Sequence, residues 1–152
     1  MKLIAHRGNT KGPDPDRENS PQQIKDCIEQ GYDVEIDVRY DPLTKELWLG
    51  HDEPQYNVTW WFLAKHNHSL WIHCKDITTL HHFAANTGGY NYFFHQNDDY
   101  TLTSKKIIWC YPGKPYTSKG VIVMPEQSNL SWESLRVTNC HGVCSDFIEK
   151  LK

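Results

Sequence analysis

Seven short apolar runs, separated by longer polar or helical segments, are the feature of this chain that most restricts its fold. Each run has the length of a β-strand, and strands that alternate with helices favour an α/β architecture with a mainly parallel sheet. A chain of 152 residues buries one core, so we expect a single domain over residues 1–152. The predicted strands are residues 2–6, 33–39, 69–75, 90–96, 106–111, 120–124 and 142–146.

One hairpin interrupts this alternation, because residues 40–45 have the composition of a turn and lead into a further strand at residues 46–50. The clearest helix starts after Ser20, which can cap it, with Pro21 at the first helical position, and it ends at Gly31. Further helices are predicted at residues 59–65, 76–86 and 131–136.

Charge and hydropathy restrict the partners of this chain. Its formal net charge is −3, and its lysines and arginines form no run, whereas a nucleic-acid-binding face is usually a cluster of basic residues. No segment has the length and apolar composition of a signal peptide or a membrane span. We therefore expect a cytoplasmic protein that binds a small molecule, does not bind a nucleic acid and does not span a membrane.

The five cysteines are predicted to be reduced thiols of the core. They are an odd number, they are scattered through apolar segments, and they form no CxxC pair. Cys140 and Cys144 flank His141 at a spacing that zinc sites use, but no second pair lies nearby, so core thiols remain the preferred interpretation.

Ionisable side chains recur at or near the ends of the predicted strands. In a parallel barrel the carboxyl ends of the strands meet at one mouth, so such residues converge there. Glu35 and Asp37 are two apart and point to the same side of their strand, as do His73 and Lys75. Inward-facing carboxylates need a partner of opposite charge, and a divalent cation is the simplest one. The residues are His6, Arg7, Glu35, Asp37, His73, Lys75, His95, Glu126 and Asp146.

Four short motifs also follow one another in the first third of the chain, and residues 142–146 add a fifth near its end. Their order resembles the motif series of the glycerophosphodiester phosphodiesterase family, relatives of phosphatidylinositol-specific phospholipase C, and the chain looks like a short and divergent member. Between the two ends the similarity is thin. The motifs are His6-Arg7-Gly8, Glu18-Asn19-Ser20, Val34-Glu35-Ile36-Asp37-Val38, Gly50-His51-Asp52 and Gly142-Val143-Cys144-Ser145-Asp146.

The resemblance implies a compact (β/α) barrel of the TIM type with a reduced helical layer. It also implies a metal-dependent phosphodiesterase that hydrolyses a glycerophosphodiester or a similar small phosphodiester. His6 and His51 would be the general acid and base, since histidine titrates near neutral pH. Arg7 would neutralise a phosphate oxygen with its planar fork, and Glu35 and Asp37 would ligate the metal.

The third strand departs from the family pattern. Where the family usually has Glu-x-Lys, this chain has His73-Cys74-Lys75. Lys75 keeps the role of a phosphate-binding lysine, and we expect His73 to ligate the metal, with Glu126 as a lower-ranked alternative. The expected metal is Mg²⁺, Ca²⁺ or Mn²⁺, and an imidazole ligand makes Zn²⁺ acceptable as well. His95 ends an aromatic strand and is a further candidate for substrate binding.

The chain is also short for the implied fold, which typically takes about 250 residues. We expect either a reduced helical layer or a homodimer, in which aromatic side chains cover the strand faces that lack helices. Two other functions stay open. One is a non-catalytic module that binds a phosphate ligand on the same barrel, and the other is a lyase that releases a cyclic phosphate.

Overall fold

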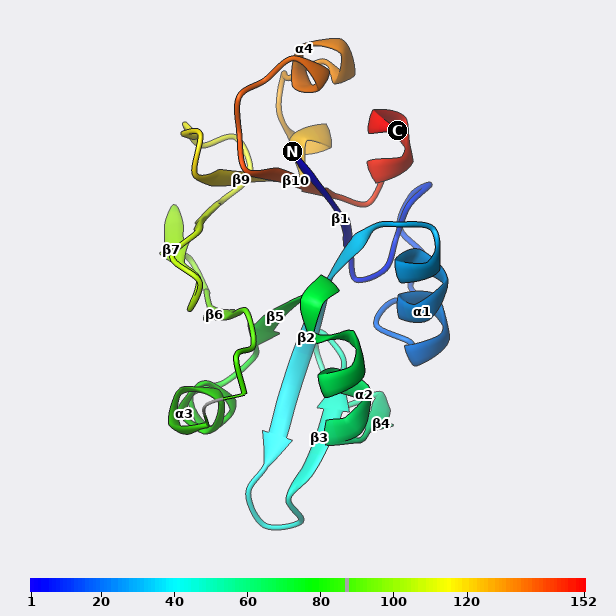
Figure 1. The fold of residues 1–152 in the computed structure, drawn as a ribbon, viewed down its shortest axis with the longest axis vertical. Coiled ribbons are helices and arrows are strands. Elements are labelled where there is room, and N and C mark those ends of the chain that lie inside the picture. The colour runs from blue at the N-terminus through cyan, green and yellow to red at the C-terminus, as the bar shows by residue number, and fades with distance from the viewer. Residues whose placement is uncertain (87) are drawn as a thin grey trace.

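The computed structural model describes residues 1–86 and 88–152, and in this part of the chain ten strands form one mixed sheet (Figure 1). The strands are β1 Lys2–His6, β2 Asp33–Asp41, β3 Glu46–Leu49, β4 Tyr56–Val58, β5 Leu70–Cys74, β6 Tyr92–Phe94, β7 Tyr100–Leu102, β8 Ile108–Cys110, β9 Gly120–Val123 and β10 Gly142–Ser145. The helices are α1 Pro21–Glu29, α2 Trp60–His66, α3 Ile77–Ala85 and α4 Trp132–Arg136, with short 3₁₀ turns η1 Asn67–Ser69, η2 Pro125–Gln127 and η3 Ile148–Leu151.

A parallel ladder forms the middle of the sheet, in the order β8, β9, β10, β1, β2, β5 and β6. β3 and β4 extend it antiparallel to the second half of β2, and β7 pairs antiparallel with β8. Among the described residues no ladder joins β6 to β7 or β8. Only isolated hydrogen bonds cross there, such as that from the Ser104 amide to the Tyr92 carbonyl at 2.8 Å.

The expectation of a TIM-type (β/α) barrel with a reduced helical layer is wrong. The sheet is a curled half-barrel with antiparallel strands at both ends, and its few short helices make up 26% of the chain. The cause lies in the segments after β6 and β8. Residues 95–107 form turns and β7, and residues 111–119 form only turns and extended chain, so neither segment supplies a helix to cover the sheet.

Where the helices do form, local signals and burial agree. The Ser20 hydroxyl accepts a hydrogen bond from the Gln23 amide at 3.2 Å, Pro21 is the first residue of α1, and Gly31 takes a positive φ of 87° after its end. These features confirm the prediction for this helix. The helices lie on the outside of the curled sheet, as Figure 1 shows.

The strand β2 shows how the sheet separates the core from the site. Val34, Ile36 and Val38 are fully buried in the main apolar cluster, whereas Glu35 and Asp37 alternate with them and face the inside of the curl. A smaller apolar cluster fills the inside of the curl. In this cluster the centre of the Trp109 ring lies 4.6 Å from that of Phe93 and 5.8 Å from that of Trp71.

Two further expectations concern properties of the whole chain. All five cysteines are buried and free, as predicted. No helix among the described residues has both the length and the apolar character that a bilayer crossing requires.

Candidate functional site

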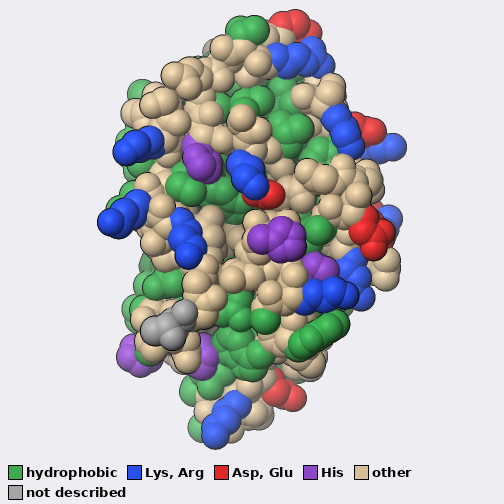
Figure 2. Space-filling model, in the orientation of Figure 1, with side chains coloured by type: hydrophobic (Ala, Val, Ile, Leu, Met, Phe, Trp, Pro, Cys, Tyr) green, Lys and Arg blue, Asp and Glu red, His purple; other side chains and the backbone are tan. Residues whose placement is uncertain are grey.

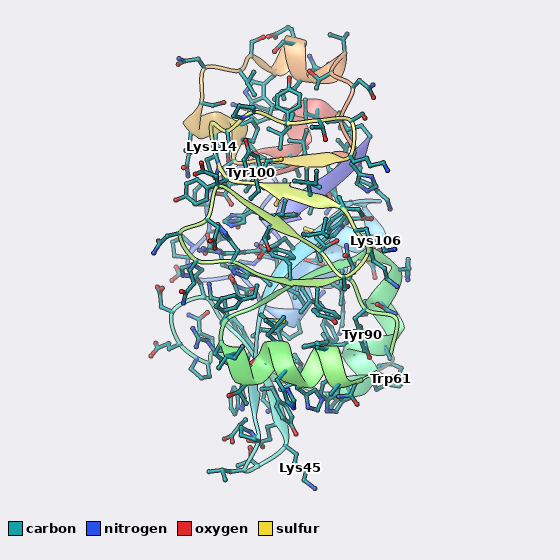
Figure 3. The ribbon with its side chains drawn as sticks, turned by 90° about the vertical axis from the view of Figure 1, so that its left-hand side faces the viewer. Lys45, Trp61, Tyr90, Tyr100, Lys106 and Lys114 are labelled. Atoms are coloured by element: carbon teal, nitrogen blue, oxygen red, sulfur yellow. The ribbon has the colours of Figure 1, made fainter. Side chains whose placement is uncertain are left out.

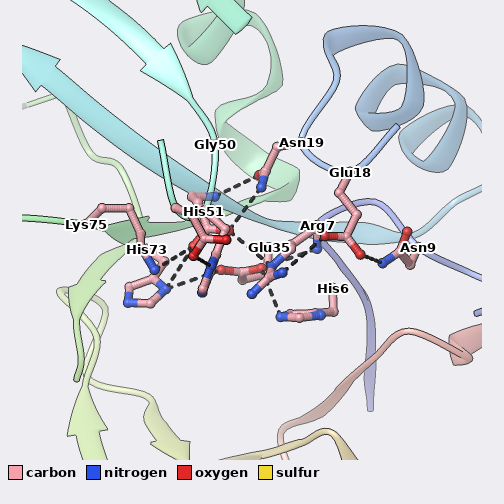
Figure 4. A network of polar contacts seen from close by, with 12 residues as sticks. His6, Arg7, Asn9, Glu18, Asn19, Glu35, Gly50, His51, His73 and Lys75 are labelled. Carbon is pink, nitrogen blue, oxygen red and sulfur yellow. Dashed lines mark hydrogen bonds and ion pairs between the residues drawn. The ribbon is translucent and has the colours of Figure 1, made fainter. Parts of the chain in front are cut away.

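Eight residues singled out in the sequence line one cavity of about 540 Å³ at the carboxyl ends of the parallel strands. Sheet curvature explains this, because it brings the ends of β1, β2, β5 and β6 toward one another. The eight are His6, Arg7, Glu35, Asp37, His51, His73, Lys75 and His95. Figure 4 shows the network of polar contacts around several of them. Glu126 is not brought to the cavity, since its carboxylate accepts hydrogen bonds from the Ser145 hydroxyl at 2.9 Å and the Asp146 amide at 3.0 Å.

Two buried carboxylates and one imidazole form the centre of this cavity. Asp37 and His73 are direct partners in the ladder between β2 and β5, and one possible ligand atom from each of Glu35, Asp37 and His73 lies within 4.8 Å of the others. His73 Nδ1 is 3.2 Å from Asp37 Oδ1 and 3.7 Å from Glu35 Oε1. The imidazole therefore stands where the sequence predicted a third ligand.

Cationic side chains surround Asp37. Arg7 Nε lies 3.2 Å from its Oδ2 atom and Lys75 Nζ lies 3.3 Å from its Oδ1 atom. Burial alone would raise the pKa of Asp37, but the adjacent His73, Lys75 and Arg7 hold it well below its usual range. Burial likewise opposes the protonation of His73, yet the two carboxylates raise its pKa to about 9. The carboxylate of Asp37 is thus ionised and largely neutralised by its neighbours.

The same residues fit a divalent cation. Asp37 Oδ1 is buried and, despite the two nitrogens near it, accepts no hydrogen bond of acceptable geometry from the described residues. On the other side of the His73 ring, Nε2 lies 3.1 Å from the carbonyl oxygen of His95, which can only accept a proton. This contact places a proton on Nε2, and in the neutral ring it leaves the Nδ1 lone pair facing the carboxylates, as a metal ligand requires.

Asn19 holds Asp37 in place, a role that the sequence did not reveal. Its side-chain amide donates to Asp37 Oδ2 at 3.0 Å, and its carbonyl oxygen accepts from the Asp37 backbone amide at 2.9 Å. Asn19 adopts a left-handed φ of 61° to reach this position, a conformation that asparagine tolerates better than most residues. The cap of α1 is Ser20, so the side chain of Asn19 is free for this contact.

Asp146 orients His6. The carboxylate lies 2.8 Å from His6 Nδ1, and Asn9 also donates to it at 2.8 Å. Burial would raise the pKa of Asp146, but the contact with His6 lowers it, so the group is ionised and Nδ1 carries the proton. The opposite nitrogen, Nε2, then faces Glu35 at 3.9 Å. Burial disfavours protonation of His6, but Asp146 and Glu35 outweigh it and raise the pKa of the ring.

Arg7 adopts a left-handed φ of 53°, which turns its backbone amide toward Glu35 Oε2 at 3.3 Å. Its guanidinium donates to Glu18 at 3.1 Å, and Asn9 donates to the same carboxylate at 2.9 Å. Glu18 thus contacts Arg7 and not the metal-ligand candidates. A strained backbone of this kind is found where surrounding contacts fix a functional side chain.

His51 sits at the rim of the cavity on the loop after β3, with 40% of its side chain exposed. Arg39 fixes this loop by donating to the carbonyl oxygens of Gly50 at 3.2 Å, His51 at 2.6 Å and Asp52 at 3.1 Å. Gly50 is required, because a Cβ atom there would lie 2.0 Å from the carbonyl oxygen of Glu53. Arg39 also lines the cavity and was not predicted to belong to the site.

The wall opposite the carboxylates is largely apolar. It consists of Trp109, Tyr111 and Met124 together with neighbouring residues, and the His95 ring lies 5.3 Å from that of Tyr111. Met124 takes a left-handed φ of 48°. The cavity therefore combines a charged half with an apolar half that suits a larger substituent.

No protein-family model, curated protein or solved structure matches this chain.

Proposed function

We propose that this protein is a metal-dependent phosphodiesterase that hydrolyses a glycerophosphodiester or a similar small phosphodiester, as the motif order in the sequence suggests. The observation that carries this proposal is that the buried cluster of Glu35, Asp37 and His73 shares one cavity with His6 and His51 and with the basic side chains of Arg7 and Lys75. A phosphodiesterase needs these components together: a site for charge neutralisation and two groups that move protons.

The charges of the cavity suit a phosphodiester once a cation is bound. Glu35 and Asp37 are balanced by Arg7 and Lys75, which contact Asp37. A divalent cation held by the two carboxylates and His73 would add positive charge and withdraw electron density from the phosphoryl oxygens. Arg7 and Lys75 would then turn toward the phosphate, to which a guanidinium can donate two parallel hydrogen bonds.

His6 is suited to accept a proton. Asp146 holds its Nδ1–H, so the Nε2 lone pair of the neutral ring faces the cavity. His6 then takes the proton of the attacking oxygen, and His51 at the rim returns a proton to the alcohol that leaves. Two outcomes follow from the nature of the attacking oxygen. A water molecule gives hydrolysis in one step, and a neighbouring hydroxyl of the substrate gives a cyclic phosphate, which phosphorus NMR detects directly.

The test is turnover by purified protein supplied with Mn²⁺, Mg²⁺ or Ca²⁺. We expect hydrolysis of glycerophosphodiesters or of bis-p-nitrophenyl phosphate, its loss on chelation, and its loss in His6→Ala and Glu35→Gln. His81→Ala is a matched control, because His81 is exposed on α3 and does not line the cavity. Activity that persists in a chelator, or in both site variants, would refute the proposal.

One observation favours a different function, a non-catalytic module that binds a phosphate ligand. Arg7, Lys75 and a protonated His73 already neutralise the two carboxylates without a metal. In that case phosphate esters would bind without turnover, and calorimetry would find no binding of Mn²⁺. Metal binding together with turnover excludes this module.

A further inference from the structure

Arg39 lies on β2 two positions beyond Asp37 and lines the same cavity. The ladder between β2 and β5 ends at Val38, and beyond it β2 pairs only with β3, where Arg39 stands opposite Trp48. In Figure 3 this hairpin of β2 and β3 projects from the body of the molecule, with the labelled Lys45 near its tip. Side chains alternate along a strand, so Arg39 faces the same side as Asp37. It therefore adds a further charged side chain of β2 to the candidate site.

Arg39 differs in its partners from the other arginine and the lysine of the cavity. Arg7 and Lys75 lie 3.2 and 3.3 Å from oxygens of Asp37. Arg39, by contrast, forms no ion pair with any residue that the structure describes. Its hydrogen bonds all go to backbone carbonyl oxygens of the loop after β3, which carry no formal charge. The positive charge of Arg39 is thus available to a ligand.

Three hydrogen bonds hold the guanidinium of Arg39 in place but leave one nitrogen unused. Nε donates to the carbonyl oxygen of Gly50, and Nη2 donates to those of His51 and Asp52. Nη1 carries two further hydrogens, donates to no described residue and is not buried. A guanidinium held in this way loses little conformational freedom when it binds a ligand. Arg39 therefore offers a fixed and charged pair of donor hydrogens to a molecule in the cavity.

The position of Arg39 next to His51 indicates which part of a substrate it would contact. Nη2 donates to the backbone carbonyl oxygen of His51 at 2.6 Å, so the guanidinium lies beside the residue proposed to protonate the leaving alcohol. Asp52 also lines this rim, but its carboxylate is 92% exposed and lies 2.7 Å from His51 Nδ1. The apolar wall with Trp109 and Tyr111 lines another part of the cavity. The leaving alcohol would thus lie next to a cation, and the other ester group next to an apolar surface.

We propose that the cavity selects phosphodiesters whose leaving alcohol carries an anionic group, a carboxylate or a second phosphate, and that Arg39 binds this group through Nη1. This rests on the proposed function, in which the phosphodiester lies at the metal-ligand candidates and the leaving alcohol lies beside His51. Hydrogen bonds from a guanidinium to an anion are roughly twice as strong as those between neutral groups. A neutral alcohol would leave Nη1 bound to water and would gain nothing from its charge.

The surface charge of the molecule as a whole would not produce such a preference. The formal net charge is −3, which does not attract anions. On the face shown in Figure 2, lysine and arginine side chains are scattered and form no continuous basic patch. A preference for an additional anionic group would therefore come from a local side chain, and Arg39 is the one that the geometry provides.

The experiment is calorimetric binding of phosphate esters to the purified full-length protein in the presence of Mg²⁺. The two esters of each pair differ by one anionic group, and no turnover is needed. The carboxylate pair is phosphoserine and phosphoethanolamine, and the phosphate pair is fructose 1,6-bisphosphate and fructose 6-phosphate. We expect the more anionic ester to bind about tenfold more tightly, the usual effect of one hydrogen bond between charged groups. The pair with the larger difference identifies the anion that Arg39 binds.

Variants of Arg39 and one control make the test specific. Arg39→Met should remove the preference within each pair, while phosphoethanolamine binds nearly as it does to the wild type. Arg39→Lys keeps the charge and should retain part of the preference. Lys45→Met is the control, because Lys45 is exposed on the same hairpin and does not line the cavity, and it should leave the preference unchanged. Circular dichroism shows whether each variant is folded, and Arg39→Gln replaces Arg39→Met if the latter does not fold.

Three results would overturn the proposal. The first is the absence of any preference in the wild type, whether it binds both members of each pair equally or binds neither. The second is equal weakening of phosphoserine and phosphoethanolamine by Arg39→Met, which would show that Arg39 only holds the loop. The third is an equal loss of preference in Lys45→Met and Arg39→Met, which would indicate attraction by general surface charge.

These outcomes differ from a failure of the proposed function. Turnover of glycerophosphodiesters without a preference in binding would leave the phosphodiesterase in place and refute the anion site. A preference that depends on Arg39, without any turnover, would do the reverse, because phosphate esters would then bind in a cavity that does not catalyse their hydrolysis.

Discussion

The two halves of the curled sheet differ in how firmly they hold their side chains. β2 is nine residues long, its first six residues are buried, and it pairs with β1, β3 and β5. β7 is three residues long, pairs in a ladder only with β8, and exposes 44% of Tyr100 and 60% of Leu102. The metal-ligand candidates all come from β2 and β5, whereas β8 supplies only apolar wall. Buried charged side chains belong in the half with β2 and β5, because these well-paired strands hold each charge at the short distance from its partner that offsets the cost of burial.

We expect the largest effect when the same type of substitution, aspartate to asparagine, is made separately in each half and the two variants are compared. Asp37→Asn should lower turnover by roughly a thousandfold or more, because it removes one of the proposed metal ligands and leaves Arg7 and Lys75 without the carboxylate that both contact. Asp99→Asn, at an exposed ion pair 2.9 Å from Lys114, should change turnover by less than about twofold.

The measurements are steady-state turnover with Mn²⁺ and calorimetric Mn²⁺ binding, with circular dichroism to show that both variants are folded. A folded Asp37→Asn protein that keeps wild-type turnover and metal affinity would contradict the assignment of the site to β2.

The second effect concerns stability. Ile36 lies between the two carboxylates in sequence and is fully buried on the opposite, helix-covered face of β2. Ile36→Ala should lower the free energy of unfolding by about 2–5 kcal/mol through lost burial and a residual cavity. Urea unfolding followed by tryptophan fluorescence measures this, and a loss below about 1 kcal/mol would show that this half is less tightly packed than the structure indicates.

The difference between the two halves also explains which parts of the fold the sequence predicted. Apolar runs with clear boundaries predicted most of the parallel strands and α1, since these depend on local composition. β4 and β7 were missed, because each has only three residues, too few to show the alternation by which a strand is recognised in a sequence. The half-barrel was not predicted, since nothing local in the sequence shows that β6 pairs with β5 alone and forms no ladder with β7 or β8 among the described residues.

Some residues of the candidate site were predicted from local sequence signals, and others were not. Motif order pointed to His6, Glu35, Asp37 and His51, and the structure places them around one cavity. Asn19 and Arg39 were missed as parts of the site. Their roles depend on contacts across 11 to 18 positions of sequence and on a left-handed backbone at Asn19, and neither leaves a local signal.

A third, smaller effect tests whether Asp146 acts through His6. Asp146→Asn should reduce kcat roughly tenfold to a hundredfold. The amide can turn its NH2 group toward His6 Nδ1, and it then no longer fixes the tautomer and orientation of the ring. KM and Mn²⁺ affinity should stay unchanged, since Asp146 does not belong to the ligand cluster. Asp146→Glu should restore part of kcat. Equal losses of kcat and of metal affinity would instead indicate a general structural role.

The smallest effect is expected from a substitution on the outer face of β7. Its size shows whether that face is exposed to solvent or covered by a second chain. If Tyr100 and Leu102 face solvent in solution, as they do in the single chain, Leu102→Lys should change the free energy of unfolding by less than about 0.5 kcal/mol. A homodimer that covers this face would bury Leu102, and the lysine would then cost well over 1 kcal/mol and make the melting temperature depend on protein concentration. Thermal unfolding at two protein concentrations, with light scattering on the same samples, separates these cases. A large, concentration-dependent loss would mean that the half-barrel completes its weaker side with a second chain rather than leaving it open.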